Sequence, residues 1–196
     1  MSPRQTDTRE QIIERARDLL QSRGIEGFSY RDISTHLGIK NAAVHYHFPS
    51  KNDLGVALIE QFTDEIRGDM EEARRHQVSP TRQLEAYFHR SEHEVDDGCQ
   101  MCAFGALAAS FERLPEELQA AVTELRKLIH GWLAETLEAG RDAGEFRFSG
   151  SATGKAMQIG TAIQGARQMS IMTGSNVVRQ VADGYREELY TRPEEN

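Results

Sequence analysis

Donor, small and aromatic side chains follow one another closely between residues 40 and 47. Lys40 and Asn41 are followed by two alanines, Ala42 and Ala43, and then by Tyr46. On a helix in the major groove of DNA, lysine reaches guanine acceptors, asparagine pairs with adenine, and alanine permits close approach or contacts a thymine methyl group. We therefore predict that the first four residues read base edges and that Tyr46 stacks on the groove wall.

Other side chains around this segment suit contacts with the phosphate backbone, which positions a protein on DNA without reading its sequence. We expect such contacts from five residues: Tyr30, Arg31, His45, His47 and Lys51. Lys51 stands at a predicted helix N-terminus, where backbone N–H groups and the helix dipole also favour an anion. The apolar residues between them are expected to be core: Ile33, Leu37, Val44 and Phe48.

A pair of thiols is the second place where the sequence could carry chemistry. Cys99 and Cys102 lie three residues apart at a predicted helix start, where the helix dipole lowers a thiol pKa. Cys99 is the better candidate for attack by an electrophile or oxidant, and Cys102 could resolve it as a disulfide. The adjacent Asp96 and Asp97 oppose the thiolate.

Two further interpretations of the thiols stay open. His89 and His93 share a helix face and precede the cysteines, so the four residues make a Cys₂His₂ set that could bind zinc. Free cysteine is also often an inert, small core residue. We assign no metal ligand at this point.

Helical periodicity dominates the chain, and the sequence shows neither the alternation of strands nor an internal repeat. An all-α protein with about nine helices is therefore expected. The first helix begins at Thr8 and stops at Gly24. Ser29 to Asp32 is a capping box for a second helix, which Gly38 ends, and a third helix covers residues 40–47. The second helix, the turn at Gly38 and the third helix together form a helix-turn-helix.

The remaining helices are expected to build a larger body. Ser50 to Asp53 caps the fourth helix after Pro49. Five further helices are predicted, with a loop at residues 144–149, and their approximate ranges are 79–95, 99–112, 114–140, 150–173 and 175–190. We place the domain boundary at residue 50, so that residues 1–50 bind DNA and residues 51–196 bind a ligand and dimerise.

The stretch YRDISTHLGIKNAAVHYHFPSKNDL, residues 30–54, resembles the DNA-binding head of the TetR family of transcription regulators. The resemblance implies operator binding by a homodimer, ligand sensing by the body, and dimerisation through the last two helices. It also implies repression that an effector relieves. The Gly98-Cys99 opening of the sixth predicted helix resembles a branch of the family with cysteine-based sensors.

Local features of the body are compatible with these implications. The eighth predicted helix is rich in glycine and alanine, which permits close helix approach, although a core helix would show the same pattern. Large or soft residues are candidates for a ligand pocket, although such residues are more often plain core: Phe88, Met101, Phe104, Phe111, Trp132, Met157, Met169 and Met172.

Charge and composition narrow the possible classes of protein. The net charge is −8, but the first 55 residues hold eight basic and seven acidic side chains, whereas the rest hold 15 and 24. A near-neutral head on an acidic body suits DNA binding at one end, and a solvated acidic surface without a partner would give the same count. No apolar run is long enough to span a membrane and no secretory signal is visible, so we expect a protein of the reducing cytoplasm.

No catalytic or cofactor-binding motif is recognisable. A glycine-rich phosphate loop, a nucleophile elbow and a His-Glu-x-x-His motif are all missing from the sequence, so we expect neither an enzyme nor a cofactor. Three alternatives are kept: a metal-responsive regulator, an enzyme with an accessory helix-turn-helix, and a DNA-bending protein without an effector.

Overall fold

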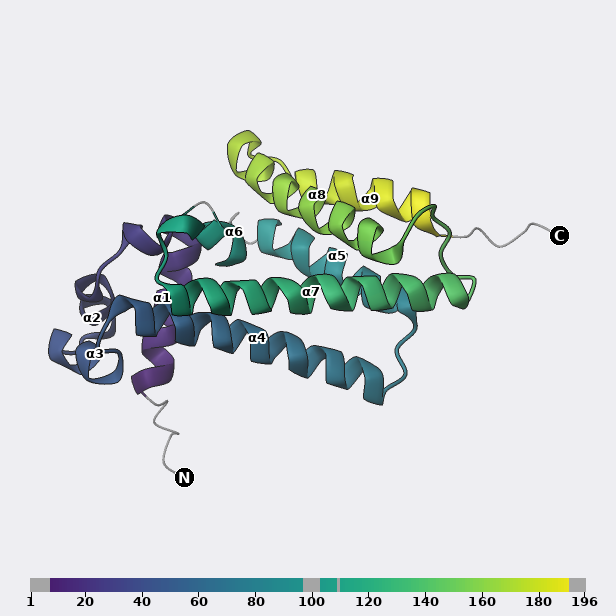
Figure 1. Cartoon of the computed structure of the whole chain (residues 1–196). Helices are drawn as coiled ribbons and strands as arrows, with labels where there is room; N and C mark the ends of the chain where they lie inside the picture. Colours follow the sequence, from purple (N-terminus) through teal and green to yellow (C-terminus); the bar gives the residue numbers. More distant parts are fainter. Residues whose placement is uncertain (1–7, 97–102, 109, 191–196) are drawn as a thin grey trace, which may run out of the picture. The chain divides into compact units, whose positions relative to one another are not determined.

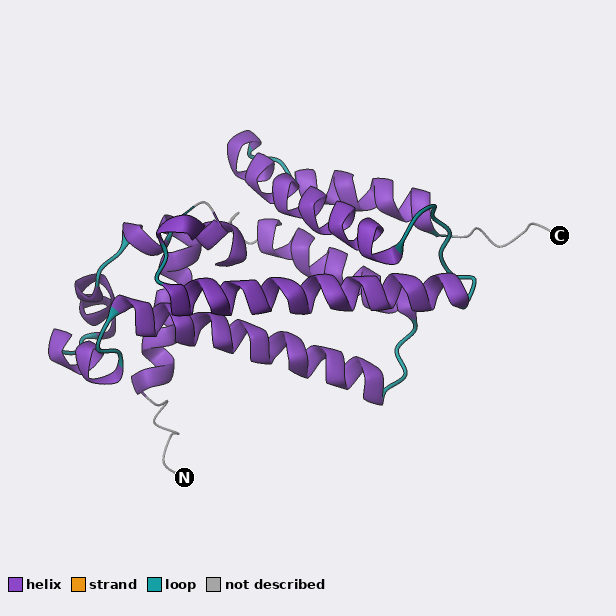
Figure 2. Ribbon diagram, in the orientation of Figure 1, coloured by secondary structure: helices purple, strands orange, loops and turns teal. Residues whose placement is uncertain are grey.

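The structure is a computed structural model of the 196-residue chain, and it describes residues 8–96, 103–108 and 110–190. In these ranges every regular element is an α-helix or a short 3-10 helix, with one isolated bridge between Phe146 and Tyr190 (Figures 1 and 2). The predicted all-α class is confirmed. The described residues form two compact units, one drawn from residues 8–64 and 103–125 and the other from residues 65–96 and 126–190.

The first unit contains the predicted helix-turn-helix. Its N-terminal elements are α1 (Thr8–Arg23), η1 (Ile25–Gly27), α2 (Tyr30–Leu37), α3 (Asn41–His47) and the first turns of α4 (Lys51–Arg75). Ile12, Leu20, Ile33, Val44 and Leu54 are fully buried, one or more from each α-helix. Apolar residues at helical spacing on α1 thus form the support on which α2 and α3 pack.

Residues 103–125 belong to the same unit. They form α6 (Ala103–Ala108), η2 (Phe111–Arg113) and the start of α7 (Glu116–Asp142). The predicted single helix over residues 99–112 is wrong in its second part, because α6 ends at Ala108 and a separate 3-10 turn follows. Ser110 bonds the Leu107 carbonyl through both its N–H (3.1 Å) and its hydroxyl (3.4 Å), a local pairing that competes with continuation of the helix.

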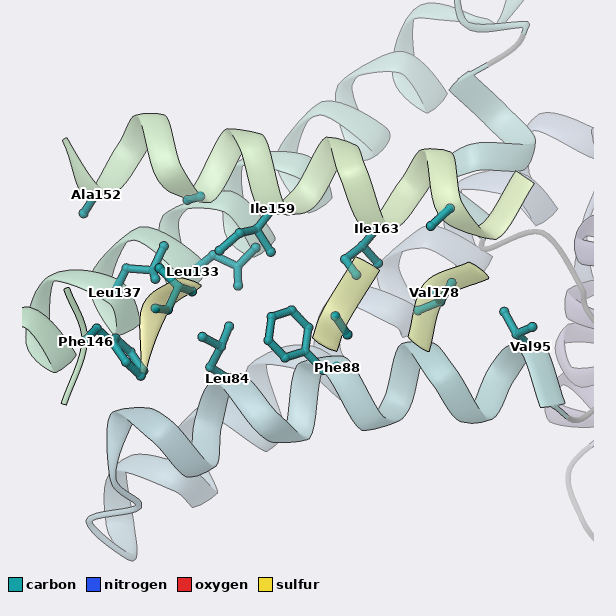
Figure 3. Packing of buried hydrophobic residues seen from close by; sticks show 14 residues of the cluster. Leu84, Phe88, Val95, Leu133, Leu137, Phe146, Ala152, Ile159, Ile163 and Val178 are labelled. Carbon is teal, nitrogen blue, oxygen red and sulfur yellow. The ribbon is translucent and has the colours of Figure 1, made fainter. Parts of the chain in front are cut away.

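The second unit contains α5 (Pro80–Asp96), α8 (Ala152–Thr173), α9 (Val177–Leu189) and the remainder of α4 and α7. Side chains from α5, α7, α8 and α9 share one apolar core, and Figure 3 shows Leu84 and Phe88 of α5 among Ile159 and Ile163 of α8. Gly174, with a φ of 66°, ends α8, and Asn176 caps α9 by accepting the N–H of Arg179 at 3.0 Å. These two residues turn the chain so that α9 returns along α8.

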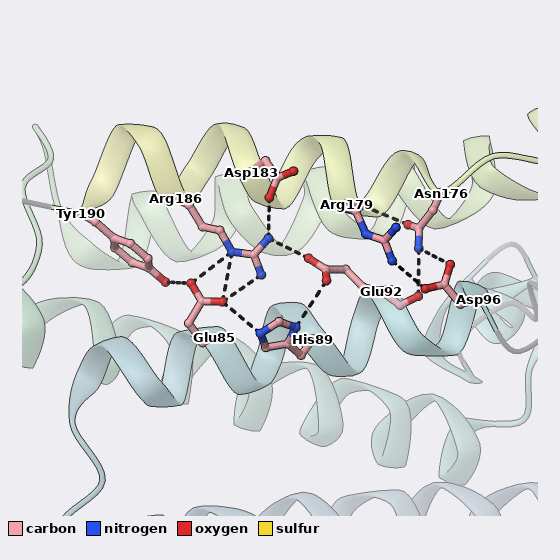
Figure 4. A network of polar contacts seen from close by, with 9 residues as sticks. All are labelled: Glu85, His89, Glu92, Asp96, Asn176, Arg179, Asp183, Arg186 and Tyr190. Carbon is pink, nitrogen blue, oxygen red and sulfur yellow. Dashed lines mark hydrogen bonds and ion pairs between the residues drawn. The ribbon is translucent and has the colours of Figure 1, made fainter.

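A network of charged side chains joins α5 to α9 (Figure 4). Arg186 of α9 donates to Glu85 at 2.9 Å and to Glu92 at 2.8 Å, and both carboxylates belong to α5. The Tyr190 hydroxyl donates to Glu85 as well. His89 lies between the two carboxylates, 3.5 Å from Glu85 and 3.4 Å from Glu92. The network was not predicted from the sequence: Glu85, His89 and Glu92 share one face of α5 by their spacing, but their partner Arg186 lies on α9, far along the chain.

Candidate nucleic-acid interface

The turn between α2 and α3 has the geometry of a helix-turn-helix. Gly38 adopts a left-handed conformation with a φ of 66° and a ψ of 24°, which glycine reaches without steric cost. The next N–H, that of Ile39, reaches back to the Ser34 carbonyl at 3.0 Å and closes the end of α2. Lys40 then starts α3 by accepting the Ala43 N–H at 2.8 Å. The chain therefore changes direction within three residues.

Two reciprocal side-chain bonds confirm the predicted helix starts. At the start of α2 the Asp32 carboxylate accepts the Ser29 hydroxyl at 2.6 Å and the Ser29 N–H at 2.8 Å, and these two bonds lower the pKa of Asp32. The Asp53 carboxylate accepts the Ser50 N–H at 2.8 Å at the start of α4. Both are capping boxes, so α3 is bounded on either side by helices with well-defined first turns.

The face of α3 that turns away from the core carries the predicted base-reading residues. Val44 is fully buried and Phe48, directly after α3, is 2% exposed, which orients the helix. Five of the predicted DNA-contacting residues of this segment are exposed: Lys40, Asn41, Ala42, His45 and Tyr46. The other two, Ala43 and His47, are partly buried. Tyr46 is 83% exposed, more than any other large apolar side chain among the described residues. The Tyr46 ring is therefore accessible to a partner outside the subunit.

Arg31 lies on the exposed face of α2. It lines a shallow surface hollow together with Ser29, Asp32, Thr35 and His36. The guanidinium is thus exposed, as a phosphate contact would require.

Tyr30 and Lys51 are placed differently from the other predicted phosphate contacts. Tyr30 is 8% exposed, and its hydroxyl donates to the Ser50 carbonyl. The Lys51 ammonium donates to the Phe28 carbonyl and lies 4.4 Å from the centre of the Phe28 ring. Both side chains already have partners within the unit, which favours a structural role.

The described residues predicted for a ligand pocket differ in burial, and they are distributed over both units. Phe88 is fully buried in the core of the second unit and Trp132 packs against that core, whereas Phe111 belongs to the first unit. Met157 and Met169 of α8 are 42% and 46% exposed, and Met172 is 78% exposed. These methionines point out of the subunit, since the inward face of α8 is occupied by Ile159 and Ile163.

The thiols are not placed by the structure. Cys99, Cys102 and Met101 lie outside the described residues, as does the side chain of Phe104. Within the described ranges no three His, Cys, Asp or Glu side chains are arranged to hold a metal ion. No described helix is long and apolar enough to cross a membrane.

Comparison with known proteins identifies the family. Residues 12–58 match the model of the bacterial regulatory proteins of the tetR family. A TetR-family transcriptional regulator from Agrobacterium tumefaciens is 29% identical with a TM-score of 0.87, over 93% of this chain and 97% of that one. A TetR transcriptional regulator from Legionella pneumophila is 28% identical with a TM-score of 0.84, over 94% and 98%.

A more distant structure shares the fold alone. Escherichia coli NemR in its reduced form is 20% identical with a TM-score of 0.80, over 94% of this chain and 98% of that one. No curated protein sequence matches this chain significantly. The helix-turn-helix, the family match across it and the two likenesses along nearly the whole length agree: residues 12–58 form a DNA-binding head of the TetR type, and the chain as a whole is similar to TetR-family transcription regulators.

Proposed function

We propose that this regulator is a homodimeric repressor that binds a palindromic operator through α3 of each subunit and leaves it when an effector is sensed. The observation that carries the DNA-binding half of this proposal is the outward face of α3. Its exposed side chains combine donors at Lys40 and Asn41 with a bare methyl group at Ala42. That combination suits base edges in the major groove.

In this proposal three further side chains contact the phosphate backbone. Arg31, His45 and His47 flank the base-reading residues on α2 and α3. Tyr46 lies between the two histidines in the sequence, and its ring meets that of His47 edge to face at a centroid distance of 5.3 Å. Residues 1–50 would therefore be the DNA-binding domain, and residues 51–196 would dimerise and sense the effector.

The outer face of α8 supports dimerisation. Six of its exposed residues form one stripe at spacings of three and four residues: Gly154, Met157, Thr161, Gly165, Gln168 and Met172. The only two charged residues of this helix are Lys155 and Arg167, and each forms an ion pair inside the subunit, with Glu188 at 2.7 Å and with Glu94 respectively. An outward helix face without charge and with small residues suits helix packing against a second copy.

Regulators of this family bind operator DNA and act as dimers. A two-fold axis between α8 and α9 of two subunits would repeat α3 once per half-site. The two recognition helices of such a dimer lie about 34–36 Å apart, one turn of DNA, so the operator should be an inverted repeat.

Selection of duplexes from a random-sequence pool tests this function. The wild-type protein should enrich an inverted repeat whose half-sites are centred about one turn, 34–36 Å, apart. Enrichment of a single half-site, or no enrichment over input, would contradict the proposal. Footprinting upstream of the protein's own reading frame then shows whether the selected sequence overlaps a promoter, as a repressor requires.

The effector is proposed to be a small molecule or an electrophile acting on the thiols. If the thiols sense it, a thiol oxidant abolishes the footprint of the wild type, and Cys99→Ser keeps the footprint in the presence of oxidant. Cys102→Ser should still respond, but the response should no longer be reversed by a reductant. Identical behaviour of all three proteins would leave a non-covalent ligand of the body as the effector.

A further inference from the structure

Two short segments on either side of the helix-turn-helix are tied to each other by reciprocal bonds. One consists of residues 28–30 before and at the start of α2, and the other of residues 50–51 at the start of α4. The side chain of Tyr30 donates to the main-chain carbonyl of Ser50. In return, the side chain of Lys51 donates to the main-chain carbonyl of Phe28. Each segment thus supplies one side-chain donor and one backbone acceptor.

The Tyr30 half of this arrangement is withdrawn from solvent. Burial, together with the negative charge of Asp53, raises the pKa of Tyr30 to about 12, so its hydroxyl keeps its proton and remains a donor at every physiological pH. The acceptor is the carbonyl that also takes the Leu54 N–H at 3.3 Å, an early helical bond of α4. Tyr30 therefore binds α4 at its origin.

The Lys51 half is partly buried. Its ammonium lies over the Phe28 ring, and Phe28 itself is 5% exposed. Burial lowers the pKa of Lys51, and the charges of Glu26 and Asp32 oppose that effect. An ammonium held by a carbonyl and a ring face would have to give up both contacts in order to reach a phosphate.

The two bonds close a loop of chain that contains all of α2 and α3. Tyr30 and Ser50 are 20 residues apart, and Phe28 and Lys51 are 23 apart. The Tyr30 ring also meets the ring of His45 on α3 at a centroid distance of 4.7 Å. The same residue therefore contacts the recognition helix and fastens the start of α4.

We propose that Tyr30 and Lys51 are positioning residues for DNA recognition, which hold α3 at a set angle to α4 by clasping residues 28–30 to residues 50–51, and are not phosphate contacts. This inference rests on base recognition by α3 in the proposed function. Loss of the clasp lets α3 turn relative to α4. Contacts to base edges then suffer first, because they tolerate less displacement than contacts to phosphates.

The test compares affinity for two duplexes, the sequence selected by the wild type and a scrambled duplex of the same composition. Tyr30→Phe removes the hydroxyl and keeps the ring, and Lys51→Met removes the ammonium and keeps most of the stem. Arg31→Met is the matched comparison, since Arg31 is an exposed cation of the same unit that the proposed function assigns to the phosphate backbone. Each affinity is measured from about 50 to 300 mM KCl to obtain the salt slope, and thermal melting confirms that each variant is folded.

Tyr30→Phe and Lys51→Met should each lose about three- to tenfold affinity for the selected duplex, as loss of one intramolecular hydrogen bond implies. Their affinity for the scrambled duplex and their salt slopes should stay at the wild-type values. Arg31→Met should reduce the slope by about 0.9, the loss of one released counterion, and weaken binding to both duplexes alike.

A slope for Lys51→Met that falls as it does for Arg31→Met, with equal weakening on both duplexes, would restore the phosphate contact and overturn the inference for Lys51. Wild-type discrimination by Tyr30→Phe would overturn it for Tyr30. Equal affinity of the wild type for both duplexes would instead mean that the proposed function has failed, and this outcome is separate from the other two.

Discussion

Asn41 illustrates what a single residue contributes to recognition by α3. Its carboxamide is exposed at the first position of the helix, where both a donor and an acceptor are available to a base edge. A bidentate pair of this kind favours adenine over the other bases. The residue should therefore matter for sequence preference more than for general affinity.

We predict that Asn41→Ala weakens binding to the selected duplex by about 1–3 kcal/mol and relaxes preference at one base pair per half-site. The measurement is a titration of the variant and the wild type against duplexes carrying each of the four base pairs at every position of a half-site. An equal loss on all of these duplexes would reassign Asn41 to the phosphate backbone.

Glu85 is the residue through which pH should act on stability. Burial raises its pKa, but hydrogen bonds from Arg186 and Tyr190 and the charge of Arg186 outweigh burial, so the pKa lies below the ordinary value of 4.5. A carboxylate with a lowered pKa in the folded state stabilises the fold above its unfolded pKa. That contribution is lost as the pH falls through the folded value.

Glu85→Gln should therefore reduce the free energy of unfolding by about 1–3 kcal/mol at neutral pH, and the difference from wild type should shrink as the pH falls below 4.5. Urea unfolding at a fixed protein concentration measures both. Glu135→Gln is the control. Glu135 forms an ion pair with Arg74 at 3.2 Å, but the two side chains are 70% and 69% exposed. This variant should change the free energy of unfolding by less than about 1 kcal/mol. A difference for Glu85→Gln that persists unchanged in acid would refute the assignment.

At the scale of elements, one glycine of α7 accommodates the loop that follows the helix. A Cβ atom at Gly140 would lie 2.1 Å from the Phe146 ring, and Phe146 is 2% exposed and stacked on Tyr190 at a centroid distance of 5.7 Å. The Gly140 carbonyl also accepts the Glu145 N–H at 2.8 Å. The end of α7 therefore depends on the absence of a side chain at this position.

Gly140→Ala should destabilise the protein by about 1–3 kcal/mol, because the buried ring has to move. Gly131→Ala on the same helix is the matched comparison, since nothing lies within 4 Å of its added Cβ atom. That variant should be more stable than the wild type by about 0.5–1 kcal/mol, the helix propensity of alanine over glycine. Denaturant midpoints of the two variants should thus shift in opposite directions, and a shift in the same direction would contradict this packing.

At the scale of the whole molecule, the exposed face of α8 bears on how many subunits assemble. The stripe of exposed residues on α8 contains large apolar side chains, of which Met172 is 78% exposed. A carboxylate at that position leaves the packing of the subunit unchanged, because the side chain contacts mainly solvent there. Across a two-fold axis, the same substitution would place two desolvated charges in an apolar interface.

Met172→Glu should therefore convert the dimer to a monomer and remove high-affinity binding to the inverted repeat. Sedimentation velocity and the same DNA titration measure the two effects. Arg82→Glu on α5 changes charge at another exposed site and should leave both properties unchanged. A Met172→Glu protein that still sediments as a dimer would exclude this end of α8 from the interface.

The sequence by itself determined the helical class, the helix-turn-helix and the starts of its helices. Gly38, the capping boxes at Ser29 and Ser50, and the apolar spacing of α1 act within one or two turns, so their effect can be recognised from neighbours in the chain. The exposed face of α3 followed from the burial of Val44 and Phe48 at helical spacing. Local chemistry was sufficient for each of these features.

Only the tertiary structure decided which donors were already occupied and which apolar residues turned outward. Tyr30 donates to a carbonyl that is 20 residues away, and Arg186 donates to Glu85 across 101 residues of chain. Met157 and Met169 are exposed because isoleucines fill the inner face of α8. A side chain's type specifies what it can bind, but its partner depends on which distant segments pack beside it. Periodicity alone could not distinguish a methionine in a pocket wall from one on an outward helix face.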